Sequence, residues 1–266
     1  MDLGLKGKAA VVVGADKPGG VARAIAEALA AEGVHIAVCG GDAAGLEETA
    51  AVLKGYAVEA YAIPGDISDA EEAEAMIDRA ARLGGIDLLV YAPEGEWGGG
   101  PIAEYDPDDW QITLEFHLVG AFLATRYALP HLVNSGAGSI VNIASMAATR
   151  SCPAHSAYAA AMAGIAQFTR DTAAEYGPQG VRANCILAGD IRTDRFEAEC
   201  RTLSALLGMS AEEVARMTAD AAPLKRLGER DDIAALAVFL CSTPAAFLTG
   251  LSIPAAGGKD VLFQAR

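Results

Sequence analysis

Short apolar runs alternate with longer alanine-rich stretches along almost the whole chain, and this rhythm limits the fold more than any other feature of the sequence. The short runs are rich in β-branched residues, whereas the longer stretches carry apolar residues at helical spacing. Such alternation is typical of β-α-β units built around a parallel sheet. We therefore expect strands at Ala9–Val13, His35–Cys39, Ala57–Ile63, Ile86–Tyr91, Ser139–Ala144, Arg182–Leu187 and Leu251–Ile253.

Helices are expected between these strands, and two of the helix starts carry chemical signatures. Ser68 and Glu71 have the spacing of a capping box, and Asp106 precedes Pro107 as an N-cap followed by proline at the first helical position. The pattern predicts an α/β fold of the Rossmann type: one domain over residues 1–266, with a doubly wound seven-stranded parallel sheet and helices on both faces. The expected helices are Val21–Glu32, Ala43–Leu53, Asp69–Leu83, Pro107–Leu132, Ala154–Tyr176 and Asp231–Cys241.

One long segment, from Asp190 to Pro223, departs from this rhythm. It follows the sixth expected strand and mixes large apolar residues with charges. A long connection at the carboxyl edge of a parallel sheet is where a substrate lid would lie, so residues 190–223 are a candidate lid. An ordinary helical excursion or an oligomer contact fits this segment equally well.

The composition favours a compact protein and argues against two classes of partner. Hydrophobic residues make up 52% of the chain and charged residues 21%, which is enough apolar material for a large buried core. The formal net charge of −15 repels phosphate backbones and anionic membranes, so we expect neither nucleic acid nor a membrane as partner. The first apolar run is too short for a signal-peptide core, and we expect a cytoplasmic protein.

The cysteines do not suggest a metal site. There are five of them, with no C-x-x-C spacing and no histidine cluster nearby. We expect reduced, mostly buried thiols at Cys39, Cys152, Cys185, Cys200 and Cys241.

A glycine-rich loop follows the first expected strand, between Gly14 and Gly20, and a helix is expected to begin at Val21. Small residues there let the backbone approach a pyrophosphate, and the helix N-terminus offers free N–H groups. The same pattern also fits a tight turn that serves only packing. Asp42, after the second strand, either reaches a ribose or N-caps the next helix, and we favour the cap.

Four polar residues at the carboxyl ends of later strands complete a familiar pattern. Asp66 follows the third strand, Ser145 closes the fifth, Tyr158 lies in the next helix and Thr193 follows the sixth strand. With these residues the chain resembles the short-chain dehydrogenase/reductase family over nearly every element from residue 8 to residue 258. In that family a serine and a tyrosine hold the substrate carbonyl, and the tyrosine passes a proton while a nicotinamide passes a hydride.

The resemblance implies a role for several residues of this chain. Ser145 and Tyr158 become the catalytic candidates, and NAD or NADP becomes the expected cofactor, with no residue that decides between the two. The candidate cofactor contacts are Gly14, Gly20, Val21, Asp42, Asp66, Ile67, Ala92 and Thr193.

The catalytic lysine of the family is missing. A tyrosine titrates near pH ~10, and a nearby positive charge is needed to make it useful at neutral pH. The family places a lysine four residues after the tyrosine, on the same helical face. Here that position is Met162, which we interpret as a packing or substrate-contact residue, and no lysine occurs between Lys54 and Lys225.

Further departures lie in the same corner. The family's Asn-Asn-Ala-Gly after the fourth strand is replaced by residues 91–94, Tyr-Ala-Pro-Glu, and its helix asparagine is replaced by His117. His117 is either a buried histidine with its hydrogen bonds satisfied or a replacement base beside Tyr158. His155 is a second histidine candidate, pointing toward substrate.

These features leave three hypotheses about function. The first is an oxidoreductase with a non-standard site that acts on a carbonyl or enone of a largely apolar small molecule. The second is a redox-neutral lyase, isomerase or dehydratase that reuses the pocket, and the third is a non-catalytic nucleotide-binding protein. The resemblance also implies a homotetramer or homodimer, built through the long helices 107–132 and 154–176 and through the C-terminal segment.

Overall fold

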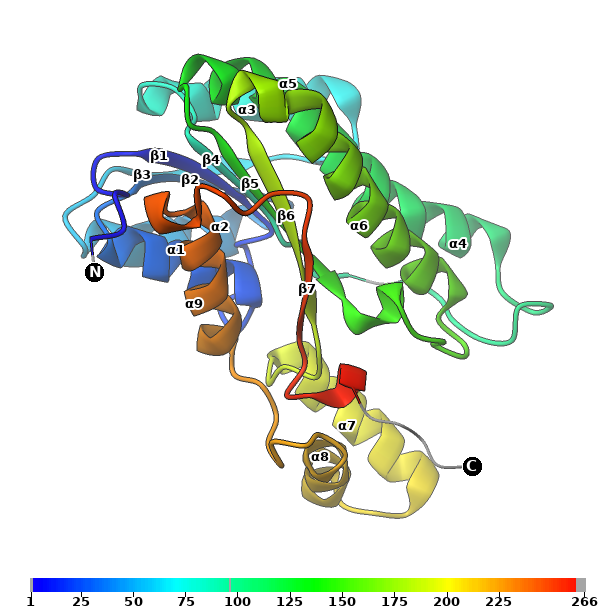
Figure 1. The fold of residues 1–266 in the computed structure, drawn as a ribbon. Coiled ribbons are helices and arrows are strands. Elements are labelled where there is room, and N and C mark those ends of the chain that lie inside the picture. Colours follow the sequence, from blue (N-terminus) through cyan, green and yellow to red (C-terminus); the bar gives the residue numbers. More distant parts are fainter. Residues whose placement is uncertain (1, 96, 262–266) are drawn as a thin grey trace.

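The computed structural model describes residues 2–95 and 97–261 and confirms the predicted parallel sheet. Its seven strands lie in the order β3-β2-β1-β4-β5-β6-β7 (Figure 1), and every neighbouring pair is parallel. The strands are β1 (Ala9–Val13), β2 (His35–Gly40), β3 (Ala60–Pro64), β4 (Leu88–Tyr91), β5 (Ser139–Ser145), β6 (Arg182–Ala188) and β7 (Ser252–Ala255).

The third strand is shorter than the sequence predicts. It begins at Ala60 instead of Ala57, because Ala57 has a backbone φ of +59°. A left-handed residue cannot continue an extended strand, and a short apolar run does not reveal such a local turn. The other strands lie within two residues of the prediction.

Helices cover both faces of the sheet (Figure 1). Helices α1 (Val21–Ala31), α2 (Ala43–Lys54) and α9 (Arg230–Cys241) lie on one face, and α3 (Ala70–Ala80), α5 (Gly120–Asn134) and α6 (Ser156–Tyr176) lie on the other. Val12 of β1 points into the first of the two apolar cores, whereas Val11 and Val13 point into the second. This alternation is the side-chain period of a strand that is buried on both faces.

The expected long helix 107–132 is interrupted. Helix α4 (Pro107–Leu114) is followed by a π-helical turn (Glu115–Val119), and α5 continues from there through Asn134. Tyr91 is fully buried and donates its hydroxyl to the Phe116 carbonyl at 2.6 Å. This bond gives the Phe116 carbonyl a partner inside the π-helical turn. The helical spacing of apolar residues does not predict such a turn.

One of the two predicted caps is correct and the other is wrong. Asp106 caps α4 by accepting from the Asp108 N–H. Asp69, not Ser68, caps α3, because the Asp69 carboxylate accepts from the N–H groups of residues 71 and 72. Ser68 donates instead to Asp66, the residue two positions before it.

The candidate lid contains two helices, α7 (Asp194–Leu207) and α8 (Ala211–Asp220), which project beyond the carboxyl edge of the sheet (Figure 1). Single 3-10 turns complete the secondary structure at Ala81–Leu83, Met146–Ala148, Gly177–Gln179, Thr243–Ala245 and Lys259–Val261.

The cysteines agree with the prediction of free thiols. Cys39, Cys185, Cys200 and Cys241 are buried, and Cys152 is partly exposed. Burial raises the pKa of Cys39, Cys185 and Cys241 to about 12, which makes these thiols unreactive near neutral pH. Within the described ranges, no helix has the length and apolarity to cross a bilayer, and no cluster of three or more candidate ligands could hold a metal ion.

Candidate active site at the carboxyl edge of the sheet

Tyr158 lies in the first turn of α6, between two side chains that can carry positive charge. The ring of His117 packs edge to face against it, with ring centroids 5.4 Å apart. On the lid helix α7, the Arg195 guanidinium carbon lies 5.3 Å from the centroid of the tyrosine ring. This separation is within the range of a cation–π contact, so Tyr158 has a cationic neighbour on α7.

His117 is buried and makes a backbone hydrogen bond. It is 2% exposed, and its Nε2 donates to the Gly95 carbonyl at 2.6 Å. Because a carbonyl only accepts, the proton of the neutral ring lies on Nε2. The structural interpretation of His117 is therefore supported, and the contact with Tyr158 keeps the catalytic one open.

Met162 and Ser145 occupy the places that the sequence predicts, with different consequences. Met162 is 2% exposed and packs in the apolar core under α6, which favours the packing interpretation over a substrate contact. Ser145 ends β5, and its Oγ accepts from the Ala147 N–H at 3.2 Å. The 3-10 turn that follows Ser145 packs against α6, the helix of Tyr158. His155 occupies the N-cap position of that helix without making a side-chain cap.

The glycine loop lies where the strand order changes direction, between β1 and β4. Gly14 has a φ of +92°, and a Cβ at this position would collide with Ala92 and Pro93. Gly20 is the N-cap residue of α1 and has no side chain to cap the helix. Gly14 therefore forms the close-approach turn that the sequence predicts, and Gly20 leaves the start of the helix without a cap from its own side chain.

An acid from the chain itself caps this helix end. Glu94, which follows β4, accepts a hydrogen bond from the Val21 N–H at 2.9 Å. Burial raises the pKa of the Glu94 carboxyl group, the Val21 hydrogen bond and Arg195 oppose that change, and the nearby acids Asp16 and Asp194 reinforce it. The carboxylate is thus half-buried among other negative charges and held by a helix N-terminus.

A pyrophosphate fits the main chain of this site but not its side chains as they lie here. A Cβ on Gly19 would collide with the carboxyl group of Asp194, and a Cβ on Gly20 would lie 3.1 Å from a Glu94 carboxylate oxygen. Two carboxyl groups therefore stand directly over the glycines that would face a phosphate. In this conformation the arrangement excludes a second anion on both steric and electrostatic grounds.

The other predicted cofactor contacts already have partners within the chain. Asp42 caps α2 through the Ala44 N–H, as favoured above. Asp66 accepts from Ser68, and Thr193 caps α7 by accepting from the Phe196 N–H at 3.2 Å. Ile67 and Ala92 are nearly inaccessible, at 4% and 3% exposure. A role in binding a dinucleotide remains a prediction for all five.

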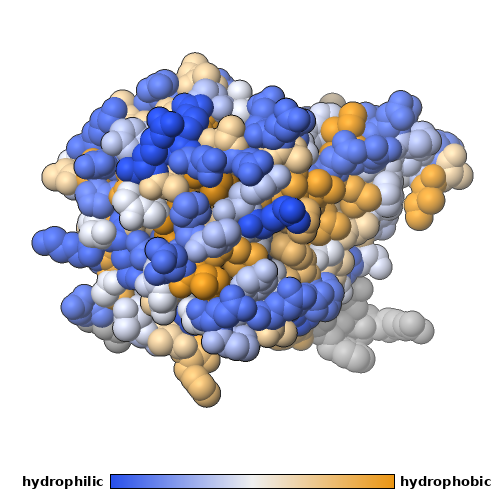
Figure 2. All heavy atoms as spheres, turned by 90° about the horizontal axis from the view of Figure 1, so that it is seen from above, coloured by the Kyte–Doolittle hydropathy of each residue, from blue (hydrophilic) through white to orange (hydrophobic). Residues whose placement is uncertain are grey.

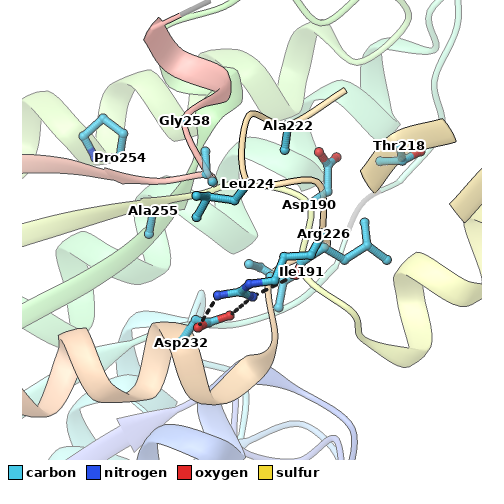
Figure 3. Close-up of a pocket in the computed structure, with 14 residues that line it drawn as sticks. Asp190, Ile191, Thr218, Ala222, Leu224, Arg226, Asp232, Pro254, Ala255 and Gly258 are labelled. Atoms are coloured by element: carbon cyan, nitrogen blue, oxygen red, sulfur yellow. Dashed lines mark hydrogen bonds and ion pairs between the residues drawn. The ribbon is translucent and has the colours of Figure 1, made fainter. Parts of the chain in front are cut away.

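A cavity of about 280 Å³ lies between the base of the lid and β7 (Figure 3). Ile191, Ala222 and Leu224 form part of an apolar lining, and Arg226 pairs with Asp232 at its margin, with the shortest distance 2.6 Å. Its lining residues do not include Ser145, Tyr158 or His117. This cavity is therefore separate from the tyrosine corner.

Glu94, Asp194 and Arg195 are the site residues that the sequence analysis missed. Glu94 carries a weak signal, because a charged residue three positions beyond a buried strand lies at the functional edge of a parallel sheet. Arg195 carries no such signal, because its contact with Tyr158 on α6 is made only when the chain folds.

The chain is similar to oxidoreductases over nearly its whole length. Residues 14–260 match the family described as Enoyl-(Acyl carrier protein) reductase. The chain is 36% identical to the D-threitol dehydrogenase of Mycolicibacterium smegmatis, over 98% of this chain and 95% of that protein. It is 29% identical to a 3-oxoacyl-[acyl-carrier-protein] reductase of Staphylococcus aureus, over 94% of this chain and 97% of that protein.

Solved structures show the same fold. The L-sorbose reductase of Gluconobacter frateurii, complexed with NADPH and L-sorbose, has a TM-score of 0.92 at 28% identity, with 99% of this chain and 100% of that chain covered. An NAD+-bound xylitol dehydrogenase has a TM-score of 0.89 at 28% identity, with 96% and 99% covered.

A doubly wound sheet with a glycine loop at its switch point and a tyrosine at the same edge defines a protein of the dinucleotide-binding Rossmann class. Within that class, the chain belongs to the short-chain dehydrogenase/reductase family. Its relatives named above are dehydrogenases and reductases of small molecules, and the two solved structures hold NADPH or NAD+.

Proposed function

We propose that this chain is an NAD(P)-dependent oxidoreductase that acts on the carbonyl or enone of a small molecule, with Tyr158 as its proton donor. The observation that carries the proposal is the position of Tyr158 between the His117 ring and the Arg195 guanidinium. A tyrosine held in this way at the functional edge of the sheet can bind a carbonyl oxygen and pass a proton to it.

Arg195 takes over the electrostatic part of the missing lysine in this proposal. A guanidinium stays charged at every working pH, so it favours negative charge that develops on the tyrosine oxygen. Ser145 is the second hydroxyl for the substrate oxygen, because it closes the strand next to α6. His117 anchors the π-helical turn and positions the tyrosine ring.

The substrate is expected to be largely apolar. The strands β4 and β5, which end at this edge of the sheet, carry no charged residue, and the candidate lid after β6 contains large apolar side chains. D-threitol and L-sorbose, which the names of two relatives contain, are small polyhydroxylated molecules. A substrate panel should therefore contain cyclic ketones and enones beside ketoses and polyols.

The test combines binding with turnover. NADH and NADPH are titrated separately into the protein while nicotinamide fluorescence is followed, and the substrate panel is then screened with the dinucleotide that binds. We expect Tyr158→Phe to lower kcat by about 10²-fold or more and to leave dinucleotide affinity unchanged, because only the transferable proton is lost. Tyr176→Phe, at the far end of the same helix, is the matched control and should keep wild-type kcat. If neither dinucleotide binds, the oxidoreductase proposal is wrong.

One observation favours a second candidate, a redox-neutral lyase, isomerase or dehydratase. The Glu94 carboxylate stands over the glycine loop, so a protein that no longer uses a dinucleotide would have no reason to clear it. Tyr158 and His117 would then act as acid and base on a bound substrate. Turnover without added dinucleotide would establish this candidate.

The non-catalytic alternative makes a simpler prediction of its own. A nucleotide-binding protein without chemistry would keep its biological role when Ser145→Ala or Tyr158→Phe is introduced. Loss of that role in a folded variant would exclude it.

A further inference from the structure

The carboxylate of Glu94 stands at the place where an anionic ligand would meet the glycine loop. Val21 is the first residue of α1, and its N–H group is one of the donors that the helix itself cannot satisfy. Glu94 supplies the acceptor from 73 positions further along the chain. The contact is therefore a tertiary one. The negatively charged Glu94 carboxylate accepts from the N–H at the helix start, as a phosphate oxygen would.

The register of the sheet brings Glu94 to this position. Val13 of β1 pairs with Tyr91 of β4, and the Ala92 N–H donates to the Val13 carbonyl at 3.1 Å. The chain then passes Gly14 at close range before Glu94 turns toward α1. Backbone contacts at the switch point of the sheet therefore fix the main chain just before Glu94.

The lid closes over the same loop. The Asp194 carboxyl group lies directly over Gly19, and the next residue, Arg195, covers the ring of Tyr158. From α9, Arg230 donates to the Pro18 carbonyl at 2.9 Å. In the first turn of α7, Asp194 thus lies over the glycine loop, and the next residue, Arg195, lies over Tyr158.

We infer that the carboxylates of Glu94 and Asp194 form an internal latch that occupies the phosphate position of the dinucleotide cleft, and that a dinucleotide binds only by displacing these two carboxylates. This inference rests on the proposed function, because it assigns the cleft to NAD or NADP. Displacement moves the Glu94 carboxylate off the Val21 N–H and Asp194 off Gly19.

The charges around the latch weaken the binding of a dinucleotide. Glu94 faces Asp16 on the glycine loop and Asp194 and Arg195 at the start of α7. A dinucleotide brings two more negative charges into this group, and it must also break the hydrogen bond at Val21. Neutralising Glu94 removes its share of the charge repulsion and weakens the hydrogen bond at Val21, because a neutral oxygen accepts less strongly than a carboxylate does.

The experiment measures dissociation constants of NAD+ and NADP+ by calorimetry for the wild type, Glu94→Gln and Glu94→Gly. Glu94→Gln keeps the shape of the side chain and removes its charge, so it serves even if the glycine variant folds poorly. We expect Glu94→Gln to tighten binding of the preferred dinucleotide by about tenfold or more. Glu74→Gln, the same change on the exposed surface of α3, is the matched control and should bind like the wild type.

A second measurement follows the pH dependence of dinucleotide affinity in the wild type, with Glu94→Gln as the comparison. Burial raises the pKa of Glu94, so lowering the pH through that pKa protonates the carboxyl group and weakens the latch. Wild-type affinity should therefore rise as the pH falls, while Glu94→Gln shows no such rise.

Each outcome decides a different point. Tighter binding by Glu94→Gln with a flattened pH profile supports the latch. Equal, measurable binding by the wild type and both Glu94 variants overturns the latch and leaves the proposed function standing. No binding by any of these proteins overturns the proposed function as well.

Discussion

At the scale of single residues, Met162 decides how far the usual family chemistry applies. It lies one helical turn after Tyr158, where the sequence resemblance led us to expect a lysine, and its side chain is packed in the core at 2% exposure. The neighbouring residues of α6, Ala161 and Ile165, are equally buried. A charged group at this position would have to leave the core or be paired within it.

Met162→Lys tests this point directly. We expect the variant to lose about 2 kcal/mol or more of unfolding free energy, because an ammonium group replaces buried apolar atoms. We also expect carbonyl reduction below that of the wild type. Urea unfolding and steady-state rates measure the two effects, and Met162→Leu is the matched control, with a loss of less than about 1.5 kcal/mol. A gain of carbonyl reduction over an inactive wild type would contradict the proposed role of Arg195.

At the scale of elements, the π-helical turn 115–119 joins two parts of the candidate site. It places His117 against Tyr158 and ties its own backbone to β4 through the Tyr91 hydroxyl. The bond from His117 to the Gly95 carbonyl fixes the loop that follows β4, and Glu94 is the residue just before that carbonyl. The turn therefore supports both the tyrosine and the latch.

His117→Phe should show this structural role. The ring volume is retained, but the 2.6 Å hydrogen bond to Gly95 is lost inside the protein. We expect the free energy of unfolding to fall by about 1–3 kcal/mol, which is the usual cost of losing a buried hydrogen-bond partner. His131→Phe, on the less buried part of α5, makes the same chemical change as a control. Equal urea midpoints for the two variants would argue against the role.

At the scale of the whole molecule, exposed apolar side chains support the expectation of a homo-oligomer. Figure 2 shows hydrophobic atoms gathered between hydrophilic ones on the face seen from above, where the long helices lie. Val119 and Phe122 are 38% and 44% exposed, and Phe122 stacks at its edge on Phe168 of α6. Large apolar surfaces of this kind are commonly covered by another subunit. We propose that these helices form the main contact of a homodimer or homotetramer.

Phe122→Asp is expected to dissociate this assembly. The carboxylate would be buried without a partner in the interface, so light scattering should report a smaller mass at the same protein concentration. Tyr56→Asp places the same charge on a similarly exposed aromatic residue that follows α2, on the opposite face of the sheet. An unchanged mass for Phe122→Asp, or an equal loss for the Tyr56 variant, would rule out this interface.

The sequence by itself determined the sheet, the helices that cover it and the family. These follow from local patterns: strand runs such as 9–13 are continuous and apolar because both faces are buried, and helix starts carry caps such as Asp106. Ser145, Tyr158 and the glycine loop could be placed at one edge because parallel strands share their carboxyl ends.

Only the tertiary structure decided what surrounds these residues. Glu94 reaches Val21, and Arg195 reaches Tyr158, across segments that are far apart in the sequence. The π-helical turn likewise depends on partners from β4 and the loop after it. Such contacts carry no local periodicity, because they arise from the register of the sheet and from the position of α7 at its carboxyl edge. The positions of Arg195 beside Tyr158 and of Glu94 over the glycine loop are therefore properties of the tertiary structure.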